Sequence, residues 1–416
     1  MQPLPGFRDF LPNDCATRNY IFERWREVAR RYGFVEWDGP VLEPTALYTK
    51  KSGPEIVGQL FNFTDKGERE VAMRPELTPS LARVVAAHDR EFKKPLKWFS
   101  IPQCFRYEKQ QRGRLREHFQ FNADIIGEES LDTDVELIAL CIDVLRSFGL
   151  TSDDFIIRLS SRRAWADFLT RRDISAEQLP PLLEVVDKIE RADISVTTAK
   201  LDVLGLSVNE VLDFARNPMV EDVALAKIVD SLNLRRLQNY VLLDLTIVRG
   251  LAYYTGIVFE AFDRRGKLRA IAGGGRYDNL IHHLSEGAVS LSAIGFAMGD
   301  VVLSELIKEV PAASEQMQIA ITAQGGLDVY VIIAKEKHRA FAVMETQSLR
   351  NAGWRVDYPL TPAKVGKQFQ TAEQRGARLA ILFGDEWPDV RLKDLRSGEQ
   401  TLVAQRELAA KLATLL

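Results

Sequence analysis

The sequence has few cysteines, no long apolar segment and almost no net charge. Its three cysteines, Cys15, Cys104 and Cys141, lie far apart in a chain of 416 residues. Their small, odd number argues against a disulfide framework or a zinc site and favours a reducing, cytoplasmic environment. Because no apolar run could cross a bilayer and the N-terminus lacks an apolar signal core, no membrane association is expected. The formal net charge is −3, so contacts with nucleic acid would depend on local basic patches.

Length and local patterning predict several domains. A chain of this length exceeds what one hydrophobic core usually supports. Apolar and acidic residues at helical spacing predict a helical insertion from about Ser160 to Tyr240. A Pro-, Ala- and Glu-bearing linker around 310–316 precedes alternating strand and helix patterns, which predict a small α/β domain with a largely parallel sheet. The predicted parts are 1–160, 161–240, 241–310 and 317–416.

Basic residues crowd the stretch FRYEKQQRGRLREHFQFNADIIG, which covers residues 105–127. Arg106 follows an apolar run, where a charge is costly unless it has a partner. Gln120 and Asp124 fall on even spacing along the returning strand and should face the same side. Such a charge run alone also fits a solvated basic hairpin. The combination of arginine with glutamine and aspartate favours the floor of a pocket that binds phosphate or carboxylate groups.

A second stretch, from about residue 245 to residue 280, repeats this chemistry. Arg249 lies between two residues of a buried-strand pattern, and Tyr253 and Tyr254 follow it closely. The triple glycine at 273–275 permits close approach of a ligand to the backbone, although a structural turn is the commoner meaning. The tyrosines also fit ordinary packing with a wet hydroxyl. Their grouping with Arg249 is what favours a binding site.

The order of these motifs resembles that of the histidyl-tRNA synthetases, which are class II aminoacyl-tRNA synthetases. The family's N-terminal signature is similar to GFRDFLP, and its motif 1 resembles WDGPVLEP. Motif 2 resembles the basic stretch, and two histidine-specific signatures resemble IVRGLAYYTG and AGGGRYD. The start of motif 3 resembles AIGFAMG, and the segment from DVYV to RLAILFG resembles the anticodon-binding domain.

The resemblance implies an α+β fold. This fold has an antiparallel sheet with flanking helices, a helical insertion and a C-terminal α/β anticodon-binding domain. The implied reaction joins L-histidine to histidine tRNA through a histidyl-adenylate, with ATP and Mg²⁺ as co-substrates. The implied assembly is a homodimer formed through the proline-bearing strand of motif 1, and no metal ligands are expected from the protein.

The resemblance also assigns roles to residues of this chain. It implies two catalytic arginines, Arg106 and Arg249, which contact the α-phosphate from opposite sides. The implied histidine site consists of Glu76, Leu77, Thr78, Arg106, Gln120, Asp124, Arg249, Tyr253 and Tyr254. The implied ATP site consists of Arg106, Glu108, Arg114 and His118, with His118 placed against adenine. In this assignment Asp124 and Tyr254 contact the two imidazole nitrogens of the substrate.

Two positions depart from the family pattern. Val302 stands where motif 3 usually has an arginine that contacts the γ-phosphate, and Ala252 replaces an aspartate of the tyrosine signature. Both departures resemble a branch of plant-organelle and some bacterial members. Asp300 would repel the triphosphate unless it helps to hold the metal ion. The expected replacements for the missing charge are Mg²⁺ and the loop arginines Arg112, Arg114 and Arg116.

Two alternatives remain open from the sequence. One is a non-catalytic relative of the same fold, such as the regulatory subunit of ATP phosphoribosyltransferase, and the motif 3 change favours it slightly. The retained Arg106, Arg249 and GRLRE loop oppose it, as does the C-terminal domain. The other alternative is a module that binds tRNA without charging it.

Overall fold

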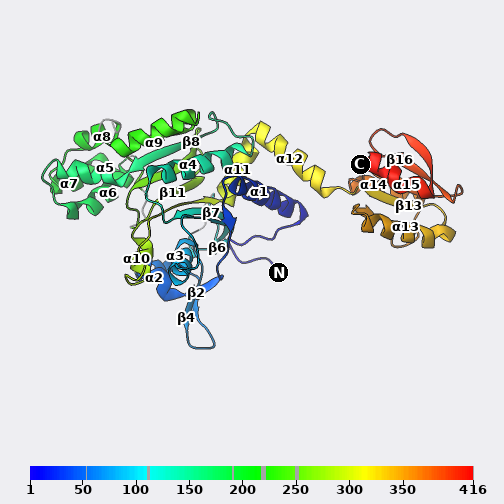
Figure 1. Ribbon diagram of the computed structural model, residues 1–416, viewed down its shortest axis with the longest axis horizontal. Helices are drawn as coiled ribbons and strands as arrows, with labels where there is room; N and C mark the ends of the chain where they lie inside the picture. Colours follow the sequence, from blue (N-terminus) through cyan, green and yellow to red (C-terminus); the bar gives the residue numbers. More distant parts are fainter. Residues whose placement is uncertain (53, 110–112, 190–191, 217–221, 249–252, 416) are drawn as a thin grey trace. The chain divides into compact units, whose positions relative to one another are not determined.

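The computed structural model describes every residue apart from 53, 110–112, 190–191, 217–221, 249–252 and 416 (Figure 1). The chain divides into two compact units, Met1–Met317 and Gln318–Leu416. Each unit has its own main sheet and hydrophobic core. Among the described residues, no helix is both long and apolar enough to cross a membrane.

A nine-stranded sheet forms the centre of the first unit. Its order is β1-β5-β7-β12-β11-β10-β8-β9, and β6 pairs with β7 outside this path. The pairs β1–β5 and β8–β9 are parallel, and the other pairs are antiparallel. The strands are β1 (Val35–Glu36), β5 (Leu96–Ser100), β6 (Gln103–Phe105), β7 (Glu117–Ile126), β8 (Phe155–Ser161), β9 (Val241–Leu243), β10 (Ile257–Asp263), β11 (Ala272–Arg276) and β12 (Ala293–Gly299).

A separate three-stranded sheet has the order β2-β4-β3. Its strands are β2 (Leu42–Pro44), β3 (Asn62–Thr64) and β4 (Glu70–Met73). The β3–β4 hairpin turns where the Asp65–Gly67 segment predicted a turn, because the Asp65 carboxylate accepts hydrogen bonds from the Gly67 and Arg69 N–H groups.

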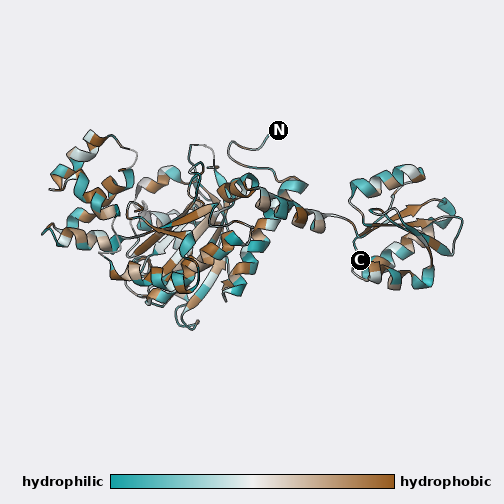
Figure 2. Ribbon diagram, turned by 90° about the horizontal axis from the view of Figure 1, so that it is seen from above, coloured by the Kyte–Doolittle hydropathy of each residue, from teal (hydrophilic) through white to brown (hydrophobic). Residues whose placement is uncertain are grey.

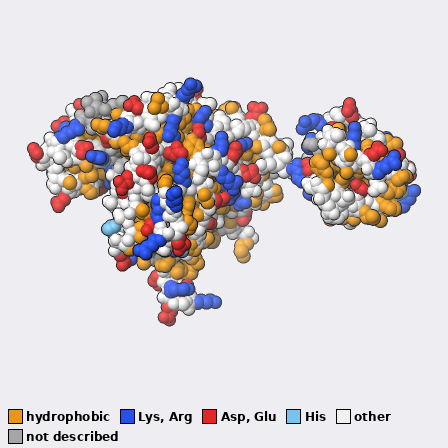
Figure 3. Space-filling view, viewed as in Figure 1, with side chains coloured by type: hydrophobic (Ala, Val, Ile, Leu, Met, Phe, Trp, Pro, Cys, Tyr) orange, Lys and Arg blue, Asp and Glu red, His pale blue; other side chains and the backbone are white. Residues whose placement is uncertain are grey.

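Figure 3 shows acidic and basic side chains mixed over the visible face, as expected for a chain with little net charge.

Helices cover the large sheet. Helix α4 packs against β7, β12 and β11 and also contacts α1, and α11 packs against β7. The helices of this layer and those near the small sheet are α1 (Pro12–Arg31), α2 (Thr45–Ser52), α3 (Thr78–Ala87), α4 (Leu131–Arg146), α10 (Leu280–Leu284) and α11 (Asp300–Glu309), with the 3-10 turn η1 (Pro54–Gln59). The helical spacing of Ile21, Trp25 and Val28 is confirmed, since all three are buried. Figure 2 shows the apolar strands at the centre of this unit.

Helices also occupy most of the segment predicted to be a helical insertion. They are α5 (Arg162–Thr170), α6 (Leu179–Lys188), α7 (Ile194–Val203), α8 (Val208–Arg216) and α9 (Val223–Leu234), with short 3-10 turns η2 (Ala176–Gln178) and η4 (Gln238–Tyr240). Figure 1 shows them gathered at one end of the first unit. Helix α9 packs against α4, so the segment is tied to the sheet layer and belongs to the same compact unit.

The second unit contains a five-stranded sheet in the order β14-β13-β15-β16-β17. The pairs of β13 are parallel, whereas β15–β16 and β16–β17 are antiparallel. The prediction of a largely parallel sheet is therefore wrong, because it missed the last two strands. The elements are β13 (Val329–Ile333), η5 (Glu336–His338), α13 (Arg339–Asn351), β14 (Val356–Asp357), α14 (Val365–Gln374), β15 (Leu379–Phe383), β16 (Asp389–Asp394), β17 (Gln400–Ala404), η6 (Gln405–Glu407) and α15 (Leu408–Leu415).

The segment predicted to be a linker around 310–316 belongs to a helix, α12 (Pro311–Gly325). Pro311 occupies the first helical turn, where its missing N–H costs nothing, and the alanines, Glu315 and Met317 that follow are good helix formers. Met317 and Ala313 are buried. The Gln316 amide donates to the Ser147 carbonyl over 2.9 Å. The start of this helix is therefore part of the first unit.

Candidate active site

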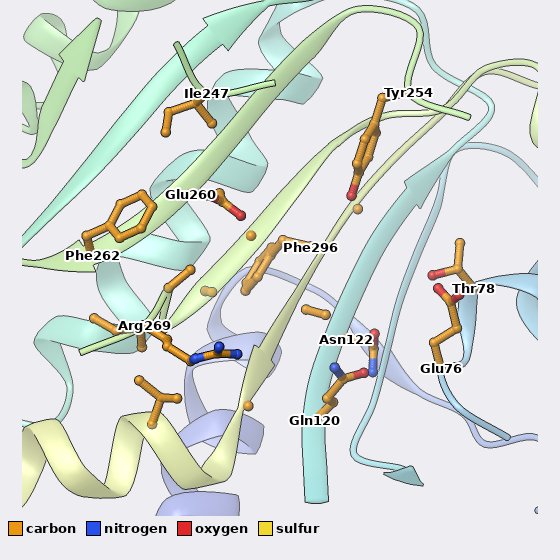
Figure 4. Close-up of a pocket in the computed structure, with 18 of the residues that line it drawn as sticks. Glu76, Thr78, Gln120, Asn122, Ile247, Tyr254, Glu260, Phe262, Arg269 and Phe296 are labelled. Carbon is orange, nitrogen blue, oxygen red and sulfur yellow. The ribbon is translucent and has the colours of Figure 1, made fainter. Parts of the chain in front are cut away.

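A cavity of about 850 Å³ opens along the large sheet. Residues of β7, β12, β11 and β10 line it, together with the segment before α3 and the segment before β10. Figure 4 shows Glu76 and Thr78 on one side, and Ile247 and Phe262 on the other. Its volume is large enough to hold more than one small chemical group.

Strand pairing explains why the floor of this cavity is polar. His118, Gln120, Asn122 and Asp124 alternate along β7, and all four line the cavity. Their partners across the β7–β12 ladder are small: Gly299 opposite Gln120, Ala297 opposite Asn122, and Gly295 opposite Asp124. A Cβ atom on Gly295 would lie 1.8 Å from Oδ1 of Asp124. The small residues of AIGFAMG therefore provide the space that the polar side chains occupy.

Asp124 lies at the more acidic end of the cavity and is 5% exposed. The hydroxyl of Tyr277 donates a hydrogen bond of 2.6 Å to its Oδ1 atom. Burial raises the pKa of Asp124 to about 7, although the hydrogen bond from Tyr277 opposes this change. The carboxylate is therefore close to its titration midpoint at neutral pH. Tyr277 belongs to the AGGGRYD signature, but nothing in the sequence indicated this hydrogen bond.

Glu76 forms an ion pair with Lys51 at the same end. The Lys51 side chain is 1% exposed, and its Nζ atom lies 4.2 Å from the centre of the Tyr253 ring. This lysine was missed, because α2 carries no sequence signal that links it to the site. The Tyr253 and Tyr254 rings lie 4.8 Å apart, and Tyr253 also meets Tyr277 edge to face. The aromatic rings form one wall of a pocket with an acidic carboxylate at its base.

Arginines gather at the other end. Arg106 directly follows β6. Its Nε atom donates a hydrogen bond of 3.0 Å to the Pro75 carbonyl, which fixes the orientation of the guanidinium group. Arg114 forms an ion pair with Glu108. Burial lowers the pKa of Arg114, and the nearby charges of Arg269 and Arg106 lower it further, while Glu108 opposes them. Like charges held this close to one another favour a site for an anion.

His118 lies among these positive charges. Burial lowers the pKa of His118 to about 3, and the charges of Arg106, Arg8 and Arg114 act in the same direction. The imidazole is therefore neutral at physiological pH, and it presents a flat ring without a charge.

A partly buried ion-pair network links the N-terminal segment to β7 and α11. Arg8 of the GFRDF signature donates to Glu117 over 2.6 Å and to Asp300 over 2.9 Å. Asp300 also accepts the Phe119 N–H over 2.9 Å. Burial raises the pKa of Asp300, and Arg8 opposes this effect. Both oxygens of Asp300 thus have protein partners, and whether it repels the triphosphate or helps to hold the metal ion stays a prediction.

The structure places the predicted site residues as follows. Those that line the cavity are Glu76, Thr78, Arg106, Arg114, His118, Gln120, Asp124, Tyr253 and Tyr254. Leu77 is buried at the start of α3, where its carbonyl accepts the Leu81 N–H. Glu108 reaches the site through its ion pair with Arg114. Arg249, Ala252 and Arg112 lie outside the described residues. The roles assigned to all of these residues stay predictions.

One of the loop arginines has a different environment from the one expected. The guanidinium of Arg116 stacks on the Tyr107 ring at 4.4 Å, and its Nε atom donates to the Glu108 carbonyl. Arg116 is therefore held by its own loop, whereas Arg114 lines the cavity.

The triple glycine is part of a buried strand rather than a turn. A Cβ atom on Gly274 would lie 2.3 Å from the Gly295 carbonyl oxygen, and one on Gly275 would lie 2.6 Å from the Ile257 carbonyl oxygen. Only Gly273 of the three lines the cavity in the described structure. The glycines therefore serve close packing between strands more than direct approach of a ligand.

The described residues contain no group of three or more His, Cys, Asp or Glu side chains that could hold a metal ion. The arginines of the cavity would also repel a bare cation.

An antiparallel sheet flanked by helices, with a polar cavity on it and arginines at one end, defines the catalytic fold of the class II aminoacyl-tRNA synthetases. The histidyl-tRNA synthetase family matches residues 6–300, and an anticodon-binding domain matches residues 328–415. The chain belongs to the histidyl-tRNA synthetase family.

Individual relatives agree with this assignment. The chain is 43% identical to the histidine–tRNA ligase of Opitutus terrae over 98% of this chain and 97% of the relative. It is 39% identical to the chloroplastic/mitochondrial histidine–tRNA ligase of Arabidopsis thaliana over 98% of this chain and 86% of the relative. The crystal structure of histidyl-tRNA synthetase from Nostoc has the same fold, with a TM-score of 0.76 at 24% identity over 100% of this chain and 99% of that chain.

Proposed function

We propose that the protein joins L-histidine to histidine tRNA in two steps. In the first step, a carboxylate oxygen of histidine attacks the α-phosphorus of ATP. The bond to the β-phosphate breaks, and pyrophosphate leaves. In the second step, a hydroxyl of the terminal adenosine of the tRNA attacks the activated carbonyl, loses its proton and displaces AMP. Because a carboxylate is already ionised at neutral pH, the first step needs alignment and charge neutralisation rather than a general base.

The observation that carries this proposal is the division of one cavity into two chemically different ends. The buried Asp124 with its Tyr277 partner can accept an imidazole N–H, and the adjacent tyrosine rings can enclose the ring. Arg106 lies toward the arginine end, where the carboxylate of histidine and the α-phosphate would meet. A site built on such polar pairs rejects an analogue that lacks them by roughly 10⁴ or more.

The neutral His118 ring offers a surface for the adenine base, and Arg114 offers a charge for the phosphates. Mg²⁺ would arrive bound to ATP as part of the substrate, because it is held mainly by phosphate oxygens and water. The second unit would bind the anticodon region of the tRNA, in keeping with the family match to residues 328–415.

A homodimer would form through the segment that contains Pro40 and β2. Exposed apolar side chains support this proposal, since Val41, Leu42 and Phe63 in and beside the small sheet are 43%, 47% and 48% exposed. Sedimentation velocity on the purified protein tests it, and a monomer at micromolar concentration would contradict it. A cytoplasmic location stays a prediction from the sequence.

Histidine-dependent exchange of pyrophosphate into ATP tests the proposed activity. Exchange should depend on histidine, and the protein should charge histidine tRNA. Exchange at background level, with histidine still bound in calorimetry, would favour the regulatory alternative. A shared fold does not separate the two functions, so the assay must decide between them.

A further inference from the structure

One cavity residue that the sequence did not single out is Arg269. It lies in the connection between β10 and β11, and it lines the same cavity as Arg114 and Val302. Figure 4 shows its guanidinium directed into the cavity, between the sides that carry Phe262 and Gln120. The side chain therefore points toward the space where the proposed reaction places ATP.

The turn around Gly113 brings three segments together at this point. A Cβ atom on Gly113 would lie 3.3 Å from Cγ2 of Val302 and 3.9 Å from Cδ of Arg269. The motif 2 turn, the start of α11 and the β10–β11 connection thus meet at one end of the cavity. Val302 contributes an apolar wall here, and Arg269 contributes a cation beside it.

The backbone of the β10–β11 connection is fixed by hydrogen bonds. The buried Asp263 accepts the N–H groups of Lys267 and Leu268 over 3.0 and 2.9 Å. The Ile271 N–H donates to the Ala261 carbonyl over 2.8 Å, and the Ile271 carbonyl accepts the Gly299 N–H over 3.3 Å. These bonds hold both ends of the short segment that presents Arg269, so its position relative to the start of α11 is set by the fold.

The charges near Arg269 are those expected at an anion site. Arg269 is close enough to Arg114 to lower the pKa of that guanidinium, and Arg106 acts on it as well. Glu108 pairs with Arg114 and offsets one of these charges. Arg114, Arg269 and Arg106 thus line one space. A chain of phosphates carries enough negative charge to contact all three guanidinium groups.

We propose that Arg269 binds the terminal phosphates of ATP and takes over the charge that is missing at Val302. This inference rests on the proposed function, and it assigns a specific part of the substrate to a residue outside the motifs. Of the three arginines, Arg106 is anchored beside Glu76 through the Pro75 carbonyl, so it serves the α-phosphate. Arg269 and Arg114, at the far end, bind the β- and γ-phosphates and then the pyrophosphate that leaves.

The test compares full-length Arg269→Ala and Arg269→Lys with Arg265→Ala, a matched control on the exposed part of the same connection. Loss of one charge-assisted partner should raise the KM values for ATP and pyrophosphate by about ten- to a hundredfold. The KM for histidine and the inhibition constant for AMP, which lacks the terminal phosphates, should change by less than about twofold. Lysine at this position should restore part of the loss, and Arg265→Ala should behave like the wild type.

A second variant separates a phosphate contact from a structural role. In the Arg269→Ala background, adding Val302→Arg should restore much of the affinity for ATP, because the new cation enters the same space from α11. An unchanged KM for ATP in Arg269→Ala would overturn the inference. An equal rise in the AMP inhibition constant would overturn it as well, since the defect would then not concern the terminal phosphates.

Failure of the proposed function is distinguishable from failure of this inference. Wild-type protein without histidine-dependent exchange would refute the ligase activity alone. Calorimetry with Mg²⁺-ATP would still compare the wild type with Arg269→Ala. A dissociation constant about tenfold weaker in the variant, with AMP binding unchanged, supports the phosphate site, and equal ATP affinities contradict it.

Discussion

Replacement of Tyr277 by phenylalanine should make histidine recognition strongly dependent on pH. The Tyr277 hydroxyl donates to Asp124 over 2.6 Å and opposes the rise in pKa that burial causes. A hydrogen bond to a charged group is worth about 1.5–3 kcal/mol, and each pKa unit corresponds to about 1.4 kcal/mol. Loss of the hydroxyl should therefore raise the pKa of Asp124 from about 7 by roughly one to two pH units.

The sign of the effect follows from the form of Asp124 that binds histidine. The ionised carboxylate accepts an imidazole N–H, so binding weakens as the pH falls through the pKa. At about pH 7, near half of Asp124 would be ionised in the wild type, against roughly a tenth or less in the variant. The KM for histidine should thus rise about 5- to 50-fold near pH 7, and the difference should shrink to about twofold or less near pH 9.

Pyrophosphate exchange measured from about pH 6 to pH 9 gives the required ratio of KM values. Histidine itself titrates in this range, but its titration cancels when the variant is divided by the wild type. The KM for ATP provides the internal control, because the arginine end of the cavity is unchanged. A ratio that stays constant across the pH range would show that Tyr277 acts through packing, and an unchanged KM at neutral pH would refute the assigned role of Asp124.

Three further predictions concern the phosphate end and the second unit. Arg249→Ala should lower the rate of adenylate formation by about a hundredfold or more with smaller changes in affinity, and single-turnover kinetics that show only weaker binding would refute this. Arg114→Ala should raise the KM for ATP more than the KM for histidine. Val302→Arg alone should not raise activity. Steady-state kinetics on both variants test these two expectations. A chain of residues 1–325, which keeps α12, should retain exchange and lose tRNA charging efficiency, and full charging would contradict the role of the second unit.

Periodic patterns predicted the elements that build the floor of the site. The even spacing of Gln120 and Asp124 placed both on one face of β7, and both line the cavity. This succeeded because a strand fixes side-chain direction by alternation alone. The same logic could have found Asn122, which lies between them at the same spacing. The role of the small residues of β12 became clear only from the ladder that pairs them with β7.

Residues that reach the site from distant segments were not predictable in this way. Arg269 and Tyr277 belong to segments far from motif 2, and the sheet order brings them to the cavity. Lys51 lies on α2 and reaches the site through its ion pair with Glu76. Helix α12 was mistaken for a linker because its proline and alanines were interpreted as an irregular segment, although proline suits the first turn of a helix. The last two strands of the second unit were missed because both are partly exposed and β16 carries several charged residues.

Burial disfavours charge at both ends of the cavity, because it lowers the pKa of His118 and raises the pKa of Asp124. Both effects serve the proposed reaction. At one end it keeps His118 neutral, so the fixed positive charges come from the arginines. At the other end it holds Asp124 near its titration midpoint, where a neutral imidazole can be recognised without a full buried charge in the empty site. Binding of the imidazole then favours the ionised carboxylate. In the proposed complex, histidine would lie with its ring toward Asp124 and its carboxylate toward Arg106, which is the direction that adenylation requires.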